Sequence, residues 1–452
     1  MNYKILFAHI RHAVFSGHRG TPHKGRTRIF STSLFFHIRP RSVPERTLRF
    51  TLTWGLGGAA VVLVFLLIGT GMLLKFVYEP FPAAAYESIT RLQHNVPFGR
   101  LMRNVHHWSG NLLLLVSFLH LLRVFFTGAF DSPRRFNWII GLGMLFLIMI
   151  ANFTGYLLPW DQLAYWAITI FTGMLEYLPG AGRWLQELIR GGAEVGPDTL
   201  MNFYALHTAV IPAALVTLMM LHFWRVRKAP GLVVPRTPEE NTNDIRKKVP
   251  TIPNLILREV VVALVVIAGV LIFSIVVDAP LLGKANPGLS PNPTKAPWYF
   301  AGVQELLMHF HPLFSLCVIP AVTVAGLVLF PYISYGGDTA GVWFASCRGR
   351  RMAVIAAVAA AVATPALIVA DEYLFDAASW LSGLPPVIGN GLIPFVIILT
   401  ATAGFSVLLK RRYSASAMER VQSVFVLLLV AFVIMTVAAI YFRGPGMKLM
   451  WP

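Results

Sequence analysis

Long apolar stretches alternate with short polar segments along the whole of this 452-residue chain. Nine of the stretches are long enough for a helix to cross a bilayer, which takes about 20 residues. They are centred near residues 64, 116, 147, 214, 268, 323, 361, 401 and 431. The pattern predicts an all-α fold, a polytopic transmembrane helical bundle of about nine spans.

The composition agrees with a membrane protein, since 56% of the residues are apolar and only 13% are charged. In a soluble protein the net charge of +18 would suggest nucleic acid as a partner. Here most Lys and Arg lie at alternate ends of the spans, on the side of the N-terminus, as the positive-inside rule describes. We therefore expect a lipid bilayer and no nucleic acid as partner, with a cytoplasmic N-terminus and an outer C-terminus.

Polar segments divide the chain into five parts. Residues 1–48 form a basic arm, which has the composition of a transit peptide but which we interpret as a cytoplasmic arm touching anionic lipid. Residues 49–229 hold four spans, and a polar inner linker follows at 230–257. Residues 258–335 hold two spans and an outer Ala-Pro-Trp-Tyr loop, and residues 336–452 hold the additional C-terminal helices.

Four histidines are the strongest candidates for chemistry, because an ionisable ring is expensive to bury in a membrane. His106 and His120 lie 14 residues apart on the second span, and His207 and His222 lie 15 apart on the fourth. These steps return to within about 40° and 60° of the same helix face. His107 points about 140° away from that face and is not expected to be a ligand.

Two such helices side by side would hold two stacked metal macrocycles, each bound by one histidine from each helix. We expect two non-covalent b-type haems, an outer one on His106 and His207 and an inner one on His120 and His222. Bis-histidine ligation leaves no open position on the iron, which suits electron transfer. The two cysteines have no metal-binding spacing, and no Cys-x-x-Cys-His motif for covalent haem occurs.

Small and cationic residues accompany the histidines at matching depths. Small residues let a flat ring approach the backbone, and two glycine pairs repeat the 14-residue spacing: Gly57 with Gly71 on the first span, and Gly141 with Gly155 on the third. Arg103 and Arg123 flank the histidines of the second span and are candidates to meet haem propionates. The alternative for both arginines is a snorkelling interfacial charge.

Several motifs occur in an order that resembles the cytochrome b subunit of the quinol-oxidising cytochrome bc and bf complexes. RNVHHWSGN, FLHLLRVFFTGAF, NFTGYLLPWDQLAYWA, FYALHTAVIP and LHFWRVRK lie in the first half, and APWYF follows in the second. The 15-residue step from His207 to His222 is similar to the bf type. In that type the second half is a separate subunit, which is fused in this chain.

The resemblance implies the quinol-oxidising subunit of a respiratory oxidoreductase, working as a homodimeric complex in the bacterial cytoplasmic membrane. One electron would go to a Rieske iron–sulfur protein and on to a c-type cytochrome. The other would cross through the two haems to a second quinone pocket near the inner face. The quinone pool would supply the substrate.

By the same resemblance, Tyr156, Trp298 and Tyr299 line the outer quinol pocket, and Arg227 and Lys228 are candidates at the inner pocket. The family's outer motif is Pro-Glu-Trp-Tyr, whereas this chain reads Ala-Pro-Trp-Tyr, so the carboxylate that would take a quinol proton is missing. Two carboxylates are candidates to replace it, although an interfacial charge facing water is the interpretation we favour for both: Glu305 and Asp278. The variant agrees with a low-potential quinol such as menaquinol.

Two other functions remain in view. The missing acid favours a non-bifurcating di-haem conduit between the quinone pool and a partner dehydrogenase or reductase. A transporter would use buried His and Asp as proton relays, but it predicts internal repeats, which the sequence does not contain. The sequence suggests no role for the last two spans.

Overall fold

Nine apolar helices form the body of the protein. The computed structural model describes residues 41–229, 232–234, 236, 247–333, 335, 340–374 and 383–451. Within this part of the chain nine helices are long and apolar enough to cross a membrane, and each contains one of the nine predicted centres. The predicted all-α membrane fold is therefore confirmed. Most of the predicted basic arm (residues 1–40) and residues 237–246 of the predicted linker lie outside the described residues.

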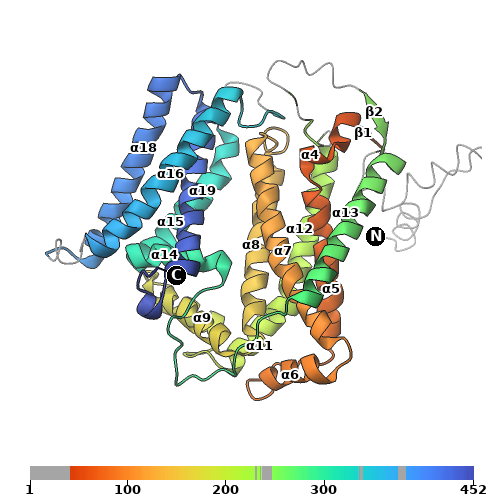
Figure 1. Ribbon diagram of the computed structural model, residues 1–452, viewed down its shortest axis with the longest axis vertical. Helices are drawn as coiled ribbons and strands as arrows, with labels where there is room; N and C mark the ends of the chain where they lie inside the picture. Colours follow the sequence, from red (N-terminus) through yellow and green to blue (C-terminus); the bar gives the residue numbers. More distant parts are fainter. Residues whose placement is uncertain are drawn as a thin grey trace, which may run out of the picture.

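The first group of helices surrounds the four central histidines (Figure 1). It consists of α5 (Leu56–Leu74), α7 (Gly99–Phe126), α8 (Arg135–Leu157), α11 (Pro197–Ala205), α12 (Ile211–Lys228) and α13 (Thr251–Val276). A π-helical turn, Leu206–Val210, joins α11 to α12 in one span. Buried leucines and valines from α5, α7 and α13 share one core, which includes Leu63, Leu113 and Val270. The amide of Asn104 also donates to the Ser274 carbonyl (2.9 Å), which fixes α13 against α7.

The second group lies on the other side of α7 and α8 (Figure 1). It consists of α15 (Ile319–Leu329), α16 (Cys347–Tyr373), α18 (Ile393–Tyr413) and α19 (Ala417–Val437), and π-helical turns adjoin three of them at Phe314–Val318, Ile388–Leu392 and Ala438–Phe442. An aromatic cluster joins the two groups, where Phe125 of α7 meets Phe330 and Phe425. The Gln422 amide of α19 donates to the Phe125 carbonyl (3.1 Å) inside this cluster.

Short helices gather towards one end of the bundle (Figure 1). They are α6 (Ala85–Asn95), α9 (Gln162–Gly173), α10 (Gly182–Arg190) and α14 (Trp298–His309). Asp161 caps α9 by accepting a hydrogen bond from the Ala164 amide (2.9 Å), since the first N–H groups of a helix have no partner inside it. Because α8 ends in Leu157, just before this cap, α9 starts beside the end of α8 and forms one wall of the site described below.

The opposite end carries α4 (Phe50–Thr53) and the two strands, where β1 (Ser42–Pro44) pairs antiparallel with β2 (Lys248–Pro250). Short 3-10 turns lie at Glu45–Leu48, Met174–Tyr177, Phe330–Tyr332 and Pro445–Met447. Since α13 begins at Thr251, residues 251–257 of the predicted linker are helical. The predicted division into five domains stays a prediction.

Candidate functional site: paired histidines and an apolar pocket

The structure brings His106 of α7 and His207 together between the helices; we call them the outer pair. Their ring centres are 6.0 Å apart and the rings are inclined at 72°. Metal–imidazole bonds are about 2 Å long, and the ring centre lies about 1 Å behind the bonding nitrogen, so two rings sharing one metal stand about 6 Å apart. The observed separation therefore fits a metal held between the two rings.

Hydrogen bonds at Nδ1 orient both outer imidazoles. His207 Nδ1 donates to the Ala151 carbonyl (2.9 Å), because a carbonyl can only accept. The Thr70 hydroxyl gives its hydrogen to the Leu66 carbonyl (2.6 Å), so it accepts from His106 Nδ1 (3.0 Å). In both rings the proton is then on Nδ1, and Nε2 keeps its lone pair for a metal.

Each of the four glycines faces one of the four histidines. A Cβ added at Gly155 would lie 2.5 Å from His207 Cε1, and one at Gly71 would lie 3.2 Å from His106 Cε1. At Gly57 and Gly141 the nearest atoms are Cε1 of His120 and of His222, each at 3.8 Å. A side chain at Gly155 or Gly71 would push the ring of His207 or His106 aside, so these two positions need glycine for the outer imidazoles to lie where they do.

His120 and His222, the inner pair, lie nearer the opposite end of the same helices. Both residues are partly buried within the bundle, where His120 faces Gly57 and His222 faces Gly141. Among the described residues no group of three or more His, Cys, Asp or Glu could hold a metal ion. Two imidazoles alone are too few ligands for a bare metal ion, whereas a macrocycle brings four nitrogens of its own. The donor set of both pairs thus fits b-type haem.

The π-helical turn at Leu206–Val210 explains why the two histidines of the fourth span are 15 residues apart, whereas those of the second span are 14 apart. A π turn inserts one extra residue into a helix, and this one contains His207. The 15-residue step from His207 to His222 therefore corresponds to a 14-residue step along a regular helix. The angle of about 60° predicted for the 15-residue step assumes a regular helix, so it is larger than the angle between His207 and His222 in a span with a π turn.

The residues beside the histidines have identified surroundings. Arg103 is buried and donates to the carbonyls of Ala279 (2.8 Å) and Pro280 (2.6 Å), after the end of α13. Arg123 is also buried, one turn beyond His120 on α7. Contact of either arginine with a haem propionate stays a prediction. His107 packs edge-on against Trp108 (4.8 Å between ring centres), and its Nε2 lies 3.3 Å from the Asn111 amide nitrogen.

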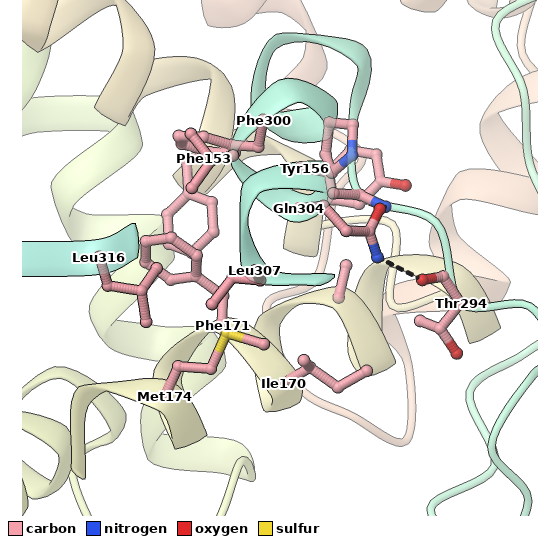
Figure 2. A pocket seen from close by; sticks show the side chains of 14 residues that line it. Phe153, Tyr156, Ile170, Phe171, Met174, Thr294, Phe300, Gln304, Leu307 and Leu316 are labelled. Atoms are coloured by element: carbon pink, nitrogen blue, oxygen red, sulfur yellow. Dashed lines mark hydrogen bonds between the residues drawn. The ribbon is translucent and has the colours of Figure 1, made fainter. Parts of the chain in front are cut away.

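An apolar pocket opens beside the outer pair, with a volume of about 550 Å³ including its mouth (Figure 2). Its walls come from the end of α8, from α9 and the turn after it, from the loop before α14, from α14 and from the π turn before α15. The lining residues are Phe153, Tyr156, Ala167, Ile170, Phe171, Met174, Thr294, Ala296, Pro297, Phe300, Val303, Gln304, Leu307 and Leu316. We call this the outer pocket. Such walls, formed mainly by apolar and aromatic side chains, suit a small apolar ring system.

The pocket and the outer pair share one turn of α8. Phe153 and Tyr156 line the pocket, and Gly155 between them faces His207. Phe153 also packs against Phe203, one turn before His207 (5.8 Å between ring centres). A ring bound in the pocket would therefore lie next to whatever the outer pair holds.

The predicted pocket residues occupy different places. Tyr156 lines the pocket (Figure 2). Tyr299 lies beside Tyr156 and packs into the core of the first group, and burial together with Tyr156 raises the pKa of its hydroxyl, which stays protonated. Trp298 donates from its indole nitrogen to Asn111 of α7 (2.7 Å) and is not among the lining residues. Tyr299 and Trp298 therefore flank the pocket, and Pro297 forms its wall.

Neither candidate carboxylate reaches the pocket. Glu305 is fully buried, but successive helix residues are about 100° apart, and the lining residues Phe300 and Leu307 define the opposite face of α14. Its carboxylate accepts hydrogen bonds from Arg443 (2.7 and 2.9 Å) instead. Asp278 pairs with Arg100 and Asn104, whose hydrogen bonds lower its pKa to about 2. The preference for an interfacial charge holds for Asp278 and does not describe Glu305.

Sequence reasoning missed most of the pocket wall. Phe153, Phe171 and Phe300 pack against one another, with ring centres 4.7 to 5.7 Å apart, and they come from α8, α9 and α14. Gln304 fixes the loop by accepting from the Ala296 amide (2.8 Å) and by donating to the Thr294 carbonyl (2.8 Å), the bond drawn in Figure 2. In the sequence, only the position of Gln304, one turn after Phe300 on the same face of α14, could have indicated that both residues line the pocket.

The chain is similar to known proteins in sequence and in fold. Residues 44–230 match the family model described as cytochrome b/b6/petB. Cytochrome b6 of Prochlorococcus marinus (strain AS9601) and cytochrome b6 of Synechococcus sp. (strain WH7803) are each 42% identical over 173 residues, which is 38% of this chain and 79% of the relative. A chain of a structure described as a hyperthermophilic respiratory complex III is similar in fold, with a TM-score of 0.60 and 22% identity over 85% of this chain and 90% of that one.

Proposed function

Because this chain belongs to the cytochrome b/b6 family, a family of multi-pass membrane proteins with b-type haems and a redox role, we propose that it oxidises quinol in the outer pocket. The outer pair would bind one haem and the inner pair a second. When bound, the haems supply single-electron transfer along the helices. The observation that carries the proposal is the shared turn of α8, where Phe153 and Tyr156 meet the pocket and Gly155 meets His207.

The chain's own groups account for binding. Phe153, Phe171 and Phe300 present aromatic faces to a quinol ring and exclude water from it. Three residues bring polar side chains to the described wall, and two of them, Gln304 and Thr294, are hydrogen-bonded to the backbone. The third, the Tyr156 hydroxyl, makes no hydrogen bond within the described residues. It can therefore bond to a quinol oxygen. Oxidation releases two protons and two electrons, and no carboxylate lines the described wall of the pocket to take the protons.

The remaining assignments follow the family resemblance. Tyr299 and Trp298 would hold the loop beside the pocket, and Arg227 and Lys228 at the inner end of α12 would serve a second quinone pocket. The proposed partners are a Rieske iron–sulfur protein and a c-type cytochrome, in a homodimeric complex. We place the complex in the bacterial cytoplasmic membrane, with the N-terminus inside and menaquinol as the proposed substrate.

A second function, a non-bifurcating di-haem conduit, is favoured by one specific observation. Pro297 stands in the pocket wall where the family has a carboxylate, and Glu305 faces the other side of α14. Without a proton acceptor at the ring, the second oxidation step of quinol has less driving force. In a conduit, both electrons would leave along one route.

Visible spectra of quinol-poised membranes containing the complex test both functions. After rapid addition of a strong oxidant, transient reduction of b-type haem would establish two electron routes, and simple oxidation would establish the conduit. His106→Ala should lower the haem content from two per chain to one and abolish quinol oxidation. His107→Ala, one residue along, is the matched control and should retain both haems. Full activity in His106→Ala would refute the proposal.

A further inference from the structure

A cluster of buried charges lies on the face of α14 that is turned away from the outer pocket. The side chains of Glu305 and Arg443 are both 0% exposed. Arg443 Nη2 and Nε donate to the two Glu305 oxygens at 2.7 and 2.9 Å, which is a bidentate pair. A charge removed from water to this extent is retained only where its partners are fixed.

Three more groups complete the cluster. Arg443 Nη1 donates to the carboxylate of Glu372 at the end of α16 (2.7 Å). His309, one turn after Glu305, contacts Glu305 (3.3 Å) and donates from Nδ1 to Asp371 (2.6 Å). Burial lowers the pKa of His309, but the hydrogen bonds to Asp371 and Glu305 prevail and raise it to about 9. The cluster thus ties α14 to the end of α16 and to Arg443, which follows the π turn after α19.

The chain's last residues also hold the loop in front of the pocket. Lys295 Nζ donates to the Ile440 carbonyl (2.6 Å), and Asn292 Oδ1 accepts from the Gly446 amide (2.5 Å). Residues 440–449, which we call the C-terminal segment, therefore contact the loop at two points and α14 at a third. Figure 1 shows the C-terminus beside α14.

Helix α14 lies between α19 on one face and the outer pocket on the other. A Cβ added at Gly302 would lie 2.6 Å from Thr436 Oγ1 and 2.8 Å from the Phe432 ring, so α19 touches the backbone of α14. On its other face α14 presents Phe300, Gln304 and Leu307 to the pocket. Any shift of α14 on the charged side consequently moves the pocket wall.

We propose that the C-terminal segment positions the outer pocket, with Arg443 as the principal positioning residue and Lys295 as a second anchor. The inference rests on the proposed function, since it concerns how quinol is held. It gives the last span a role, because α19 touches the α14 backbone and Arg443 follows that span, while α16 supplies Asp371 and Glu372. Arg443 touches no substrate and acts through Glu305 and the α14 backbone.

The test measures quinol oxidation by the full-length chain in its complex, per mole of haem, with short-chain ubiquinol and menaquinol analogues. Arg443→Gln should raise the KM for quinol about tenfold or more, because sub-ångström misplacement of binding groups is costly. The haem content and both haem midpoint potentials should be unchanged. Arg443→Lys, which keeps the charge but not the fork, should recover part of the loss.

The matched control is Arg348→Gln. Arg348 pairs with Glu419 (3.1 Å) and joins the same two helices, α16 and α19, at their other end. It should leave KM unchanged even if it lowers thermal stability. Lys295→Met, in a half-buried loop position that leaves the charged cluster intact, should raise KM about threefold, in keeping with the loss of one hydrogen bond.

The outcomes separate the two proposals. If the unaltered complex oxidises no quinol, the proposed function fails and this inference with it. If the unaltered complex is active and Arg443→Gln has the same KM as Arg348→Gln, the inference alone is overturned. If Arg443→Gln yields no folded protein, Lys295→Met decides, and an unchanged KM in that variant overturns the inference.

Discussion

Substituting alanine at the four glycines should damage haem binding in an order that their distances set. At Gly155 the new Cβ would lie 2.5 Å from His207 Cε1 and 3.0 Å from Nδ1. Ordinary carbon contacts are about 3.5–4.0 Å, so the His207 ring would have to retreat by about 1 Å. Overpacking of this kind costs about 1–3 kcal/mol, and a metal bond of about 2 Å does not survive a displacement of half its length.

We therefore expect Gly155→Ala to lose the outer haem, and the haem content to fall towards one per chain. Gly71→Ala, with its Cβ at 3.2 Å from the ring of His106, should shift the outer haem potential with partial loss. Gly57→Ala and Gly141→Ala, with the new Cβ at 3.8 Å from His120 and His222, leave the imidazoles in place and should lose the least haem. The assay is the haem-to-protein ratio with a redox titration. Two haems of unshifted potential in Gly155→Ala would refute the reasoning.

Three further predictions concern single groups around the pocket. Tyr156→Phe removes the wall hydroxyl that has no partner among the described residues and should raise the KM for quinol about fivefold to tenfold, in line with a hydrogen bond of about 1 kcal/mol; an unchanged KM would exclude that bond. His309 has a folded-state pKa of about 9, above the unfolded value of about 6.5, so its contribution of up to about 3 kcal/mol is complete below pH 6.5 and is lost as pH rises through 9. The melting temperature in detergent should fall across that window, and His309→Asn should flatten the decline. Trp298→Phe breaks the bond to Asn111 and should lower stability by about 0.5–1 kcal/mol with both haems kept, as a thermal melt and a haem spectrum would record.

The histidines and glycines could be predicted because each rests on one local rule. Apolar length gives the spans, and helical repeat gives the common face of His106 and His120. The pocket wall rests on no such rule, because Phe153, Phe171 and Phe300 come from three elements and are ordinary apolar residues along the sequence. Only the packing of α9 and α14 against α8 brings them together.

Glu305 illustrates a different limit. Its distance from the pocket motif suggested a substitute acid, although the helical repeat of α14 puts it on the other face from Phe300. The reason for its burial was not visible, because its partner Arg443 is 138 residues away along the chain. Long-range ion pairs of this kind are decided by how the last helices pack, which the pattern of spans does not determine.

Three of the four π turns in the described residues, in contrast, have a signal in the sequence. Those at Leu206–Val210, Phe314–Val318 and Ile388–Leu392 are each followed by Ile and then Pro, at Pro212, Pro320 and Pro394. Proline offers no N–H and crowds the carbonyl four residues earlier, so the helix widens just before it. The Ile-Pro after His207 thus indicates that the extra residue in the 15-residue step is absorbed locally.

Deleting one residue of that turn tests this explanation. Ala209 is exposed and lies between His207 and Pro212. If the π turn absorbs one residue, deletion of Ala209 converts it to regular helix and leaves both histidines of the fourth span on their face, with two haems per chain. If the extra residue instead turns the helix, deletion rotates His207 by about 100° and the outer haem is lost. A second protein combines the deletion with Pro212→Ala, which removes the clash of the proline ring with the preceding turn. If the deletion protein and the combined protein both bind only one haem, the 15-residue spacing itself, and not the π turn, aligns His207 with His106.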